Sequence, residues 1–94
     1  MIASFNNAAL KRYWTTGKAK GLPARDISKI TRILSLLHAA TKPSDMNLPG
    51  YRFHQLKGDR KGTYAVTVRA NWRVTFEWEN GAPVRVDLED YHGD

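Results

Sequence analysis

The feature that most constrains the fold is the alternation of apolar and polar residues over three stretches in the second half of the chain. These stretches are Thr63 to Val68, Trp72 to Trp78 and Val84 to Leu88. Because successive side chains of a β-strand point to opposite faces, each stretch predicts a strand with one apolar face. Asn80-Gly81 is a strong signal for a tight turn, and Ala70-Asn71 is a plausible second one. The sequence therefore predicts an antiparallel meander, preceded by a further strand from Tyr51 to Leu56.

The alternation also assigns the two faces of this sheet. The apolar face comprises Tyr64, Val66, Val68, Trp72, Val74, Phe76, Trp78, Val84, Val86 and Leu88. The opposite face carries Thr63, Thr67, Arg69, Arg73, Thr75 and Glu77. In the preceding strand Tyr51 and Phe53 point inward, while Arg52 and His54 point outward. We therefore expect His54 and Arg73 to share a polar, partly basic surface that is open to a ligand.

The part of the chain before Pro49-Gly50 has helical patterns. A short helix is predicted from about Asn7 to Thr16, with Asn6 or Asn7 as its N-cap and Gly17 directly after its end. A second helix is predicted from Pro23 to about Ala40, because apolar residues recur there at helical spacing and proline suits a first helical position. The two helices are expected to form a hairpin. Residues 2–5 could add a short strand.

Together these patterns predict an α+β fold, a compact antiparallel sheet with an N-terminal helical hairpin packed on one face. A chain of 94 residues is long enough for one domain and too short for two, so we expect residues 1–94 to form a single domain.

The sequence contains no cysteine, which excludes disulfides and thiolate metal sites. It has neither a signal-peptide pattern nor an apolar run long enough for a membrane helix. It also lacks a metal-ligand cluster, a phosphate loop and the glycine pattern of dinucleotide-binding proteins. We therefore expect a cytoplasmic protein that binds neither a cofactor nor a membrane.

The charge of the chain favours an anionic partner, since 15 Lys and Arg face nine Asp and Glu and give a net charge of +6. The charges are unevenly placed. Residues 11–32 hold seven bases and one acid, residues 51–73 hold six bases and one acid, and residues 77–94 hold six acids and one base. Nucleic acid is the partner class that fits two basic stretches. For the first stretch, a solvated helix surface is an equal alternative.

The loop from His54 to Gly62 combines two glycines with Lys57, Arg60 and Lys61. Such cations can neutralise the phosphates of nucleic acid, which is the main source of sequence-independent affinity. The alternative is a solvated hairpin loop, because Gly-Asp and Lys-Gly are ordinary turn pairs.

The stretch Asp90-Tyr91-His92 adds groups that can donate or accept a proton. Metal-free cleavage of RNA needs a base for the 2′-hydroxyl proton, an acid for the departing 5′-oxygen, and cations that stabilise the phosphate. Histidine suits both proton-transfer tasks, so His54 and His92 are candidates for them in either order.

The remaining tasks also have candidates. Arg73 and Lys57 can stabilise the phosphate, Asp90 can orient a histidine, and Tyr91 can stack on a base or bind phosphate. His38 is expected to be a packing or helix-terminal residue instead.

Four separated stretches of the sequence resemble the HigB-type toxins of the RelE/ParE superfamily. They are Met1-Ile-Ala-Ser-Phe5, Pro49-Gly-Tyr-Arg-Phe-His54-Gln-Leu-Lys-Gly-Asp-Arg-Lys-Gly62, Asn71-Trp-Arg-Val-Thr-Phe76 and Glu89-Asp-Tyr-His92. The resemblance implies a RelE-like fold and the toxin of a type II toxin-antitoxin system. It implies a metal-independent endoribonuclease that cleaves messenger RNA on the ribosome and so inhibits translation. A helix-turn-helix, HigA-like antitoxin would silence it, and operator DNA would be bound only through the complex with that antitoxin.

The resemblance also implies roles for individual residues. His54, Asp90, Tyr91 and His92 match the catalytic cluster of the family. Lys57 and Arg73 match its phosphate-binding and transition-state cations, and Arg60 and Lys61 lie in its basic, RNA-holding loop. Two alternatives use the same fold without this chemistry: a ParE-like gyrase poison, and a nucleic-acid-binding co-repressor that acts only with its antitoxin.

Overall fold

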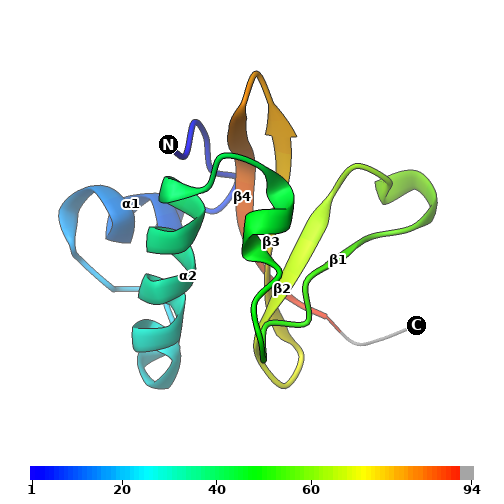
Figure 1. Cartoon of the computed structure of the whole chain (residues 1–94). Helices are drawn as coiled ribbons and strands as arrows, with labels where there is room; N and C mark the ends of the chain where they lie inside the picture. Colours follow the sequence, from blue (N-terminus) through cyan, green and yellow to red (C-terminus); the bar gives the residue numbers. More distant parts are fainter. Residues whose placement is uncertain (92–94) are drawn as a thin grey trace.

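The computed structural model describes residues 1–91 as an antiparallel sheet with helices on one side (Figure 1). The helices are α1 (Ala8–Thr16) and α2 (Ile27–Ala39), and the short 3₁₀ turns are η1 (Ala24–Asp26), η2 (Pro43–Met46) and η3 (Gly58–Arg60). The strands are β1 (His54–Gln55), β2 (Tyr64–Arg69), β3 (Trp72–Glu79) and β4 (Ala82–Asp90). They pair in the order β1-β2-β3-β4, each antiparallel to its neighbour. The predicted α+β class and the meander are confirmed.

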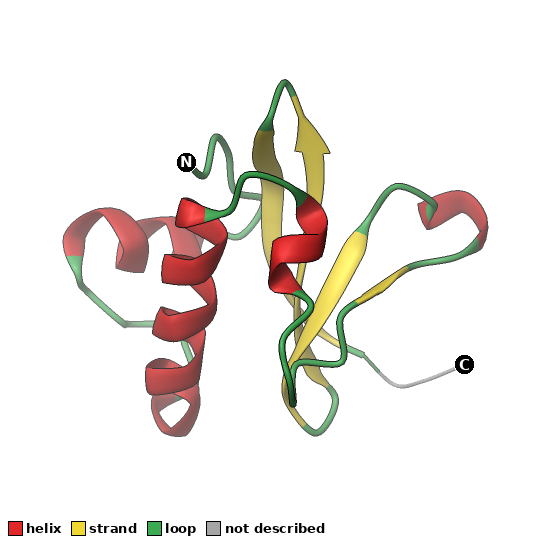
Figure 2. Cartoon of the chain, in the orientation of Figure 1, coloured by secondary structure: helices red, strands yellow, loops and turns green. Residues whose placement is uncertain are grey.

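The core lies between α2 and one face of the sheet (Figure 2). It joins the apolar side of the helices to alternate residues of β2, β3 and β4, as the sequence pattern predicts. Its fully buried members include Leu10, Ile30, Ile33, Leu34, Leu37, Val66, Val74, Phe76 and Val86. Neither helix of residues 1–91 is long and apolar enough to cross a membrane.

Helix α1 begins and ends where the capping signals predict. The Asn7 side chain accepts a hydrogen bond from the Leu10 backbone N–H at 2.9 Å, and Gly17 follows α1 with a φ of +80°. The predicted second helix differs at its start, because residues 24–26 form the 3₁₀ turn η1 and the α-helix begins at Ile27. The two helices contact each other through the Tyr13 hydroxyl and Thr31 Oγ1, which lie 2.6 Å apart.

The N-terminal segment runs along the free edge of β4. Phe5 forms an isolated parallel bridge with Val86, and the Ala3 backbone N–H donates to the Pro83 carbonyl at 2.8 Å. The prediction of a strand here is right in place, although only one residue is bridged. His38 of α2 contacts this segment, because its Nδ1 accepts a hydrogen bond from the Ile2 N–H at 3.3 Å. The His38 ring also packs on Trp14. The packing role predicted for His38 is confirmed.

The predicted strand from Tyr51 to Leu56 is wrong in extent, because only His54 and Gln55 pair as β1. Gly50 and Arg52 both have positive φ, +84° and +52°, which bends the backbone away from a regular strand. Tyr51 is buried in the core, and its carbonyl accepts from the Thr67 N–H at 2.8 Å. The segment is therefore bent but fixed in place at its centre.

The predicted position of Arg69 on the open face is also wrong. The pairing of β2 with β3 shifts between Thr67 and Arg69, which breaks the simple alternation. Arg69 instead makes two hydrogen bonds to the buried Asp26 carboxylate, at 2.8 and 3.1 Å. Hydrogen bonding to Arg69 lowers the pKa of Asp26 below its ordinary value. This ion pair joins the start of α2 to the end of β2.

Asp26→Asn is expected to lower the free energy of unfolding by about 2 kcal/mol, because it leaves Arg69 without its carboxylate. We take a value below that of a fully buried pair, since the Arg69 side chain is 36% exposed. Urea unfolding of the wild type, Asp26→Asn and the exposed control Asp59→Asn measures the effect. Equal stabilities of the two variants would contradict the assignment.

Candidate active site

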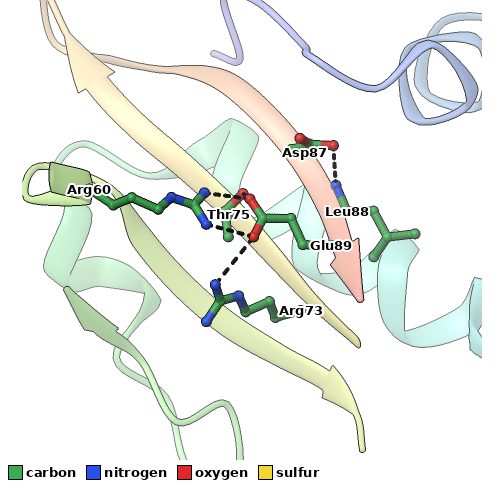
Figure 3. A network of polar contacts seen from close by, with 6 residues as sticks. All are labelled: Arg60, Arg73, Thr75, Asp87, Leu88 and Glu89. Carbon is green, nitrogen blue, oxygen red and sulfur yellow. Dashed lines mark hydrogen bonds and ion pairs between the residues drawn. The ribbon is translucent and has the colours of Figure 1, made fainter. Parts of the chain in front are cut away.

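The open face of the sheet carries a network of polar side chains centred on Glu89 of β4 (Figure 3). Arg60 of η3 donates to both carboxylate oxygens of Glu89, at 2.9 and 2.5 Å. Arg73 and Thr75 of β3 donate to the same carboxylate, at 3.2 and 2.9 Å. The network thus links the loop between β1 and β2 to the opposite end of the strand order.

These contacts fix the charge of Glu89. The pKa of Glu89 is lowered to about 2, mainly by hydrogen bonding to Arg60 and to a smaller extent by hydrogen bonding to Thr75 and Arg73. Partial burial of the carboxylate acts in the opposite direction. The same pairing raises the pKa of Arg60. At neutral pH the carboxylate is therefore ionised and holds both guanidinium groups in place.

Arg73 is the most enclosed cation of the site, with only 8% of its surface exposed. Its guanidinium carbon lies 3.8 Å from the centre of the Tyr91 ring, a close cation–π contact. Among residues 1–91, no acceptor bonds its buried Nε. A buried donor without an acceptor costs free energy, so the setting of Arg73 is not explained by stability alone. Arg73 also lines the two clefts described next, where its positive charge can meet an anion.

Two adjoining clefts open beside Arg73, with volumes of about 720 and 310 Å³. His54, Arg73 and Tyr91 line both of them. Lys57 and Arg60 line the smaller cleft. The structure therefore brings together five of the residues that the sequence singles out.

The ring of His54 is oriented by the backbone carbonyl of Arg52. Its Nδ1 lies 2.8 Å from the carbonyl oxygen of Arg52. Because a carbonyl can only accept, the proton of the neutral ring belongs on Nδ1, which leaves Nε2 as the proton acceptor. Arg52 has the positive φ noted above, so the bent segment before β1 gives His54 its setting.

Lys61 and Asp90 do not line these clefts. Lys61 is exposed, and Asp90 is exposed at the end of β4, paired in register with Trp72. His92 lies outside the described residues.

The sequence places Thr75 on the open face and Glu89 in a stretch that carries the family resemblance, but neither residue was given a role in the site. A signal for both was present, because inward-facing Val86 and Leu88 place Asp87 and Glu89 on the face of Arg73 and Thr75. That face was expected to be open, whereas Thr75 is only 2% exposed beneath the network. The acidic end of the sequence thus neutralises part of the basic surface.

The Glu89 network makes stability depend on acidity. Because the pKa of Glu89 lies below its ordinary value in the folded protein, its contribution is complete above about pH 4.5 and is lost as the pH falls toward 2. With Arg60 44% exposed, we expect about 1–2 kcal/mol after allowing for solvent screening. The test is thermal unfolding of the wild type and Glu89→Gln between pH 7 and 2.5. Over this range the stability of Glu89→Gln should fall less than that of the wild type. Glu79→Gln, in the exposed pair with Arg85, is the control, and a Glu89→Gln profile parallel to the wild type would refute the assignment.

Comparison with known proteins identifies the family. A family model described as "RelE-like toxin of type II toxin-antitoxin system HigB" matches residues 3–92. The chain is 42% identical to "Endoribonuclease HigB" of Proteus vulgaris, over 98% of this chain and 100% of the relative. It is 29% identical to "Toxin HigB-1" of Vibrio cholerae, over 97% and 98% of the two chains.

Solved structures agree on the fold. The crystal structure of a point mutant of YafQ from E. coli matches with a TM-score of 0.62 at 19% identity, covering 96% of this chain and 91% of that one. The crystal structure of YafQ from E. coli strain BL21(DE3) matches with a TM-score of 0.54 at 10% identity and the same coverage. This confirms the predicted architecture. The chain therefore belongs to the HigB-like family of RelE-like toxins of type II toxin-antitoxin systems.

Proposed function

We propose that the chain is an endoribonuclease that cleaves messenger RNA on the ribosome without a metal ion. The observation that carries the proposal is the convergence of His54, Arg73 and Tyr91 on two adjoining clefts. This set offers a proton acceptor, an enclosed guanidinium and an aromatic ring to one ligand. The name of the Proteus vulgaris relative, an endoribonuclease 42% identical over nearly the whole chain, supports the same activity.

The reaction we propose is attack by the 2′-oxygen of the RNA on the adjacent phosphorus. His54 Nε2 takes the proton of the 2′-hydroxyl as the new P–O bond forms. The bond from phosphorus to the 5′-oxygen breaks, and that oxygen receives a proton from a general acid. The products are a 2′,3′-cyclic phosphate and a 5′-hydroxyl. We assign the general acid to His92, which follows Tyr91 directly in the sequence.

Cations stabilise the negative charge that builds on the phosphate. Arg73 is suited to this because it lies against the Tyr91 ring and lines both clefts, and Lys57 adds charge from the smaller cleft. Glu89 binds Arg60 and one end of Arg73, so it positions these groups and offsets part of their positive charge. We retain Asp90 as the residue that orients His92, and Arg60 and Lys61 as outer RNA contacts.

As the toxin of a toxin-antitoxin system, the protein has an antitoxin as partner. We propose that this partner is a helix-turn-helix protein of the HigA type, and that operator DNA is bound only through their complex. The cytoplasm, where messenger RNA is translated, is the location that fits this activity.

The test is incubation of the purified protein with a defined messenger RNA, in the presence and absence of translating ribosomes. The proposal predicts discrete cuts that require ribosomes and that are made equally well by protein that has been stripped with EDTA and freed of the chelator before it is added. Intact messenger together with gyrase trapped on DNA would show instead that the protein acts as a gyrase poison.

A further inference from the structure

The groove beside the start of α2 lies outside the machinery described above. Arg25 of η1 and Ser28, Lys29 and Arg32 of α2 form one wall, and residues 49–51 form the other. The groove has a volume of about 410 Å³. We refer to it as the α2 groove. Its three cations belong to the first basic stretch of the sequence, residues 11–32, and the proposed chemistry gives them no role.

The cations of the α2 groove form no close ion pairs with acids of the described residues. Within residues 1–91, none of Arg25, Lys29 and Arg32 has a carboxylate within ion-pair distance, whereas Arg60, Arg69, Arg73 and Arg85 all do. Asp26, the acid nearest along the chain, acts on Arg25 and Lys29 through its charge, but its carboxylate is hydrogen-bonded to Arg69. The groove therefore keeps positive charge that can meet an external anion.

Lys29 connects the α2 groove to the candidate active site. It lines the α2 groove and also the 720 Å³ cleft that contains His54, Arg73 and Tyr91. Its Nζ lies 5.4 Å from the centre of the Tyr51 ring, so the ammonium group is held at the boundary of the two. Arg52, which is exposed and lines the same cleft, adds a further cation to it. Basic side chains therefore line both the α2 groove and the cleft of the candidate active site.

We propose that the α2 groove binds the backbone of the single-stranded RNA that is being cut, beyond the scissile phosphate. This inference rests on the proposed RNA substrate. It extends the binding site for that RNA to the α2 groove, where Arg25, Lys29 and Arg32 would contact further phosphates. Because Lys29 lines both the α2 groove and the cleft of the candidate active site, we favour the substrate strand as the occupant of the groove over a separate RNA or a protein. Phosphate contacts of this kind add affinity without reading sequence.

Binding of 2′-O-methyl RNA tests the inference apart from cleavage, because this backbone lacks the attacking hydroxyl. We compare oligonucleotides of about four and about twelve nucleotides, a range typical of single-strand binding sites. The wild type should bind the longer one more tightly. In the triple variant Arg25→Gln, Lys29→Gln, Arg32→Gln this advantage should fall by about 10- to 100-fold at 0.1 M salt, and the slope of log affinity against log salt should become shallower by about 2.

The matched control is Lys11→Gln, Arg12→Gln, Lys18→Gln, which removes the same charge from exposed residues outside the three clefts. It should keep most of the preference for the long oligonucleotide. Equal losses in both triple variants would overturn the proposal, as they would reflect net charge alone. Loss of ribosome or antitoxin binding with an unchanged length preference would also overturn it, and would assign the groove to that partner. A protein that shows the predicted binding but cuts no messenger would contradict only the proposed function.

Discussion

Replacing His54 by alanine is expected to lower the rate of RNA cleavage on ribosomes by about 10² to 10⁴-fold, the usual contribution of one general acid or base. The variant loses the Nε2 acceptor that the hydrogen bond from Nδ1–H to the Arg52 carbonyl orients. Stability should change little, because His54 is exposed. Single-turnover cleavage of a defined messenger, beside a thermal unfolding curve, measures both quantities.

The control for this prediction is His38→Gln, since His38 packs against Trp14 and the N-terminal segment and lines none of the three clefts. It should cut at close to the wild-type rate. Removing a proton acceptor should also flatten the acidic limb of the pH–rate profile, which a purely structural effect would leave in place. Wild-type cleavage by His54→Ala would exclude His54 from the chemistry.

Arg73→Lys is expected to slow cleavage by about 10² to 10³-fold, although the positive charge is kept. Lysine cannot present the planar guanidinium that contacts Glu89 and lies over the Tyr91 ring. We expect the loss in kcat rather than in KM, because the guanidinium is needed most when charge builds on the phosphate.

Arg85→Lys provides the comparison, because Arg85 pairs with Glu77 and Glu79 and lines none of the three clefts. It should cut normally. Since Arg73 is buried, unfolding curves must accompany the kinetics. An Arg73→Lys protein that is folded and cuts as fast as the wild type would show that Arg73 does not act on the transition state.

Much of the fold could be predicted because its signals are local. Asn7 and Gly17 mark the ends of α1, and the positive φ values of Asn80 and Gly81 match the turn that this pair predicts. Alternation predicts Val66, Val74 and Phe76 in the core, and each is fully buried. In these cases, sequence neighbours alone determine the conformation.

The errors arose where distant parts of the chain meet. Arg69 turns toward α2 because a register shift coincides with a buried carboxylate on η1, and alternation within one strand contains neither fact. The segment around Tyr51 departs from strand geometry at Gly50 and Arg52, whose positive φ values the alternation does not indicate. Tyr51 nevertheless packs in the core, and Arg52 and His54 line a cleft, as the alternation predicts.

The sequence predicted which residues meet in the candidate site better than how they are bonded and enclosed there. His54, Arg73 and Tyr91 do meet, but no pattern along the chain indicates how far Glu89 and Arg60 enclose Arg73. That enclosure depends on the η3 loop, β3 and the end of β4 at once. Glu89, rather than any cation, is the residue through which these elements connect.

The most direct test of the central claim uses a messenger in which only the nucleotide 5′ to the mapped cut carries a 2′-deoxy sugar. If the 2′-oxygen is the nucleophile in the site of His54 and Arg73, cutting at that position should stop while translation of the messenger continues. On the unmodified messenger, the upstream fragment should end in a 2′,3′-cyclic phosphate. Undiminished cutting at the deoxy position would contradict the account.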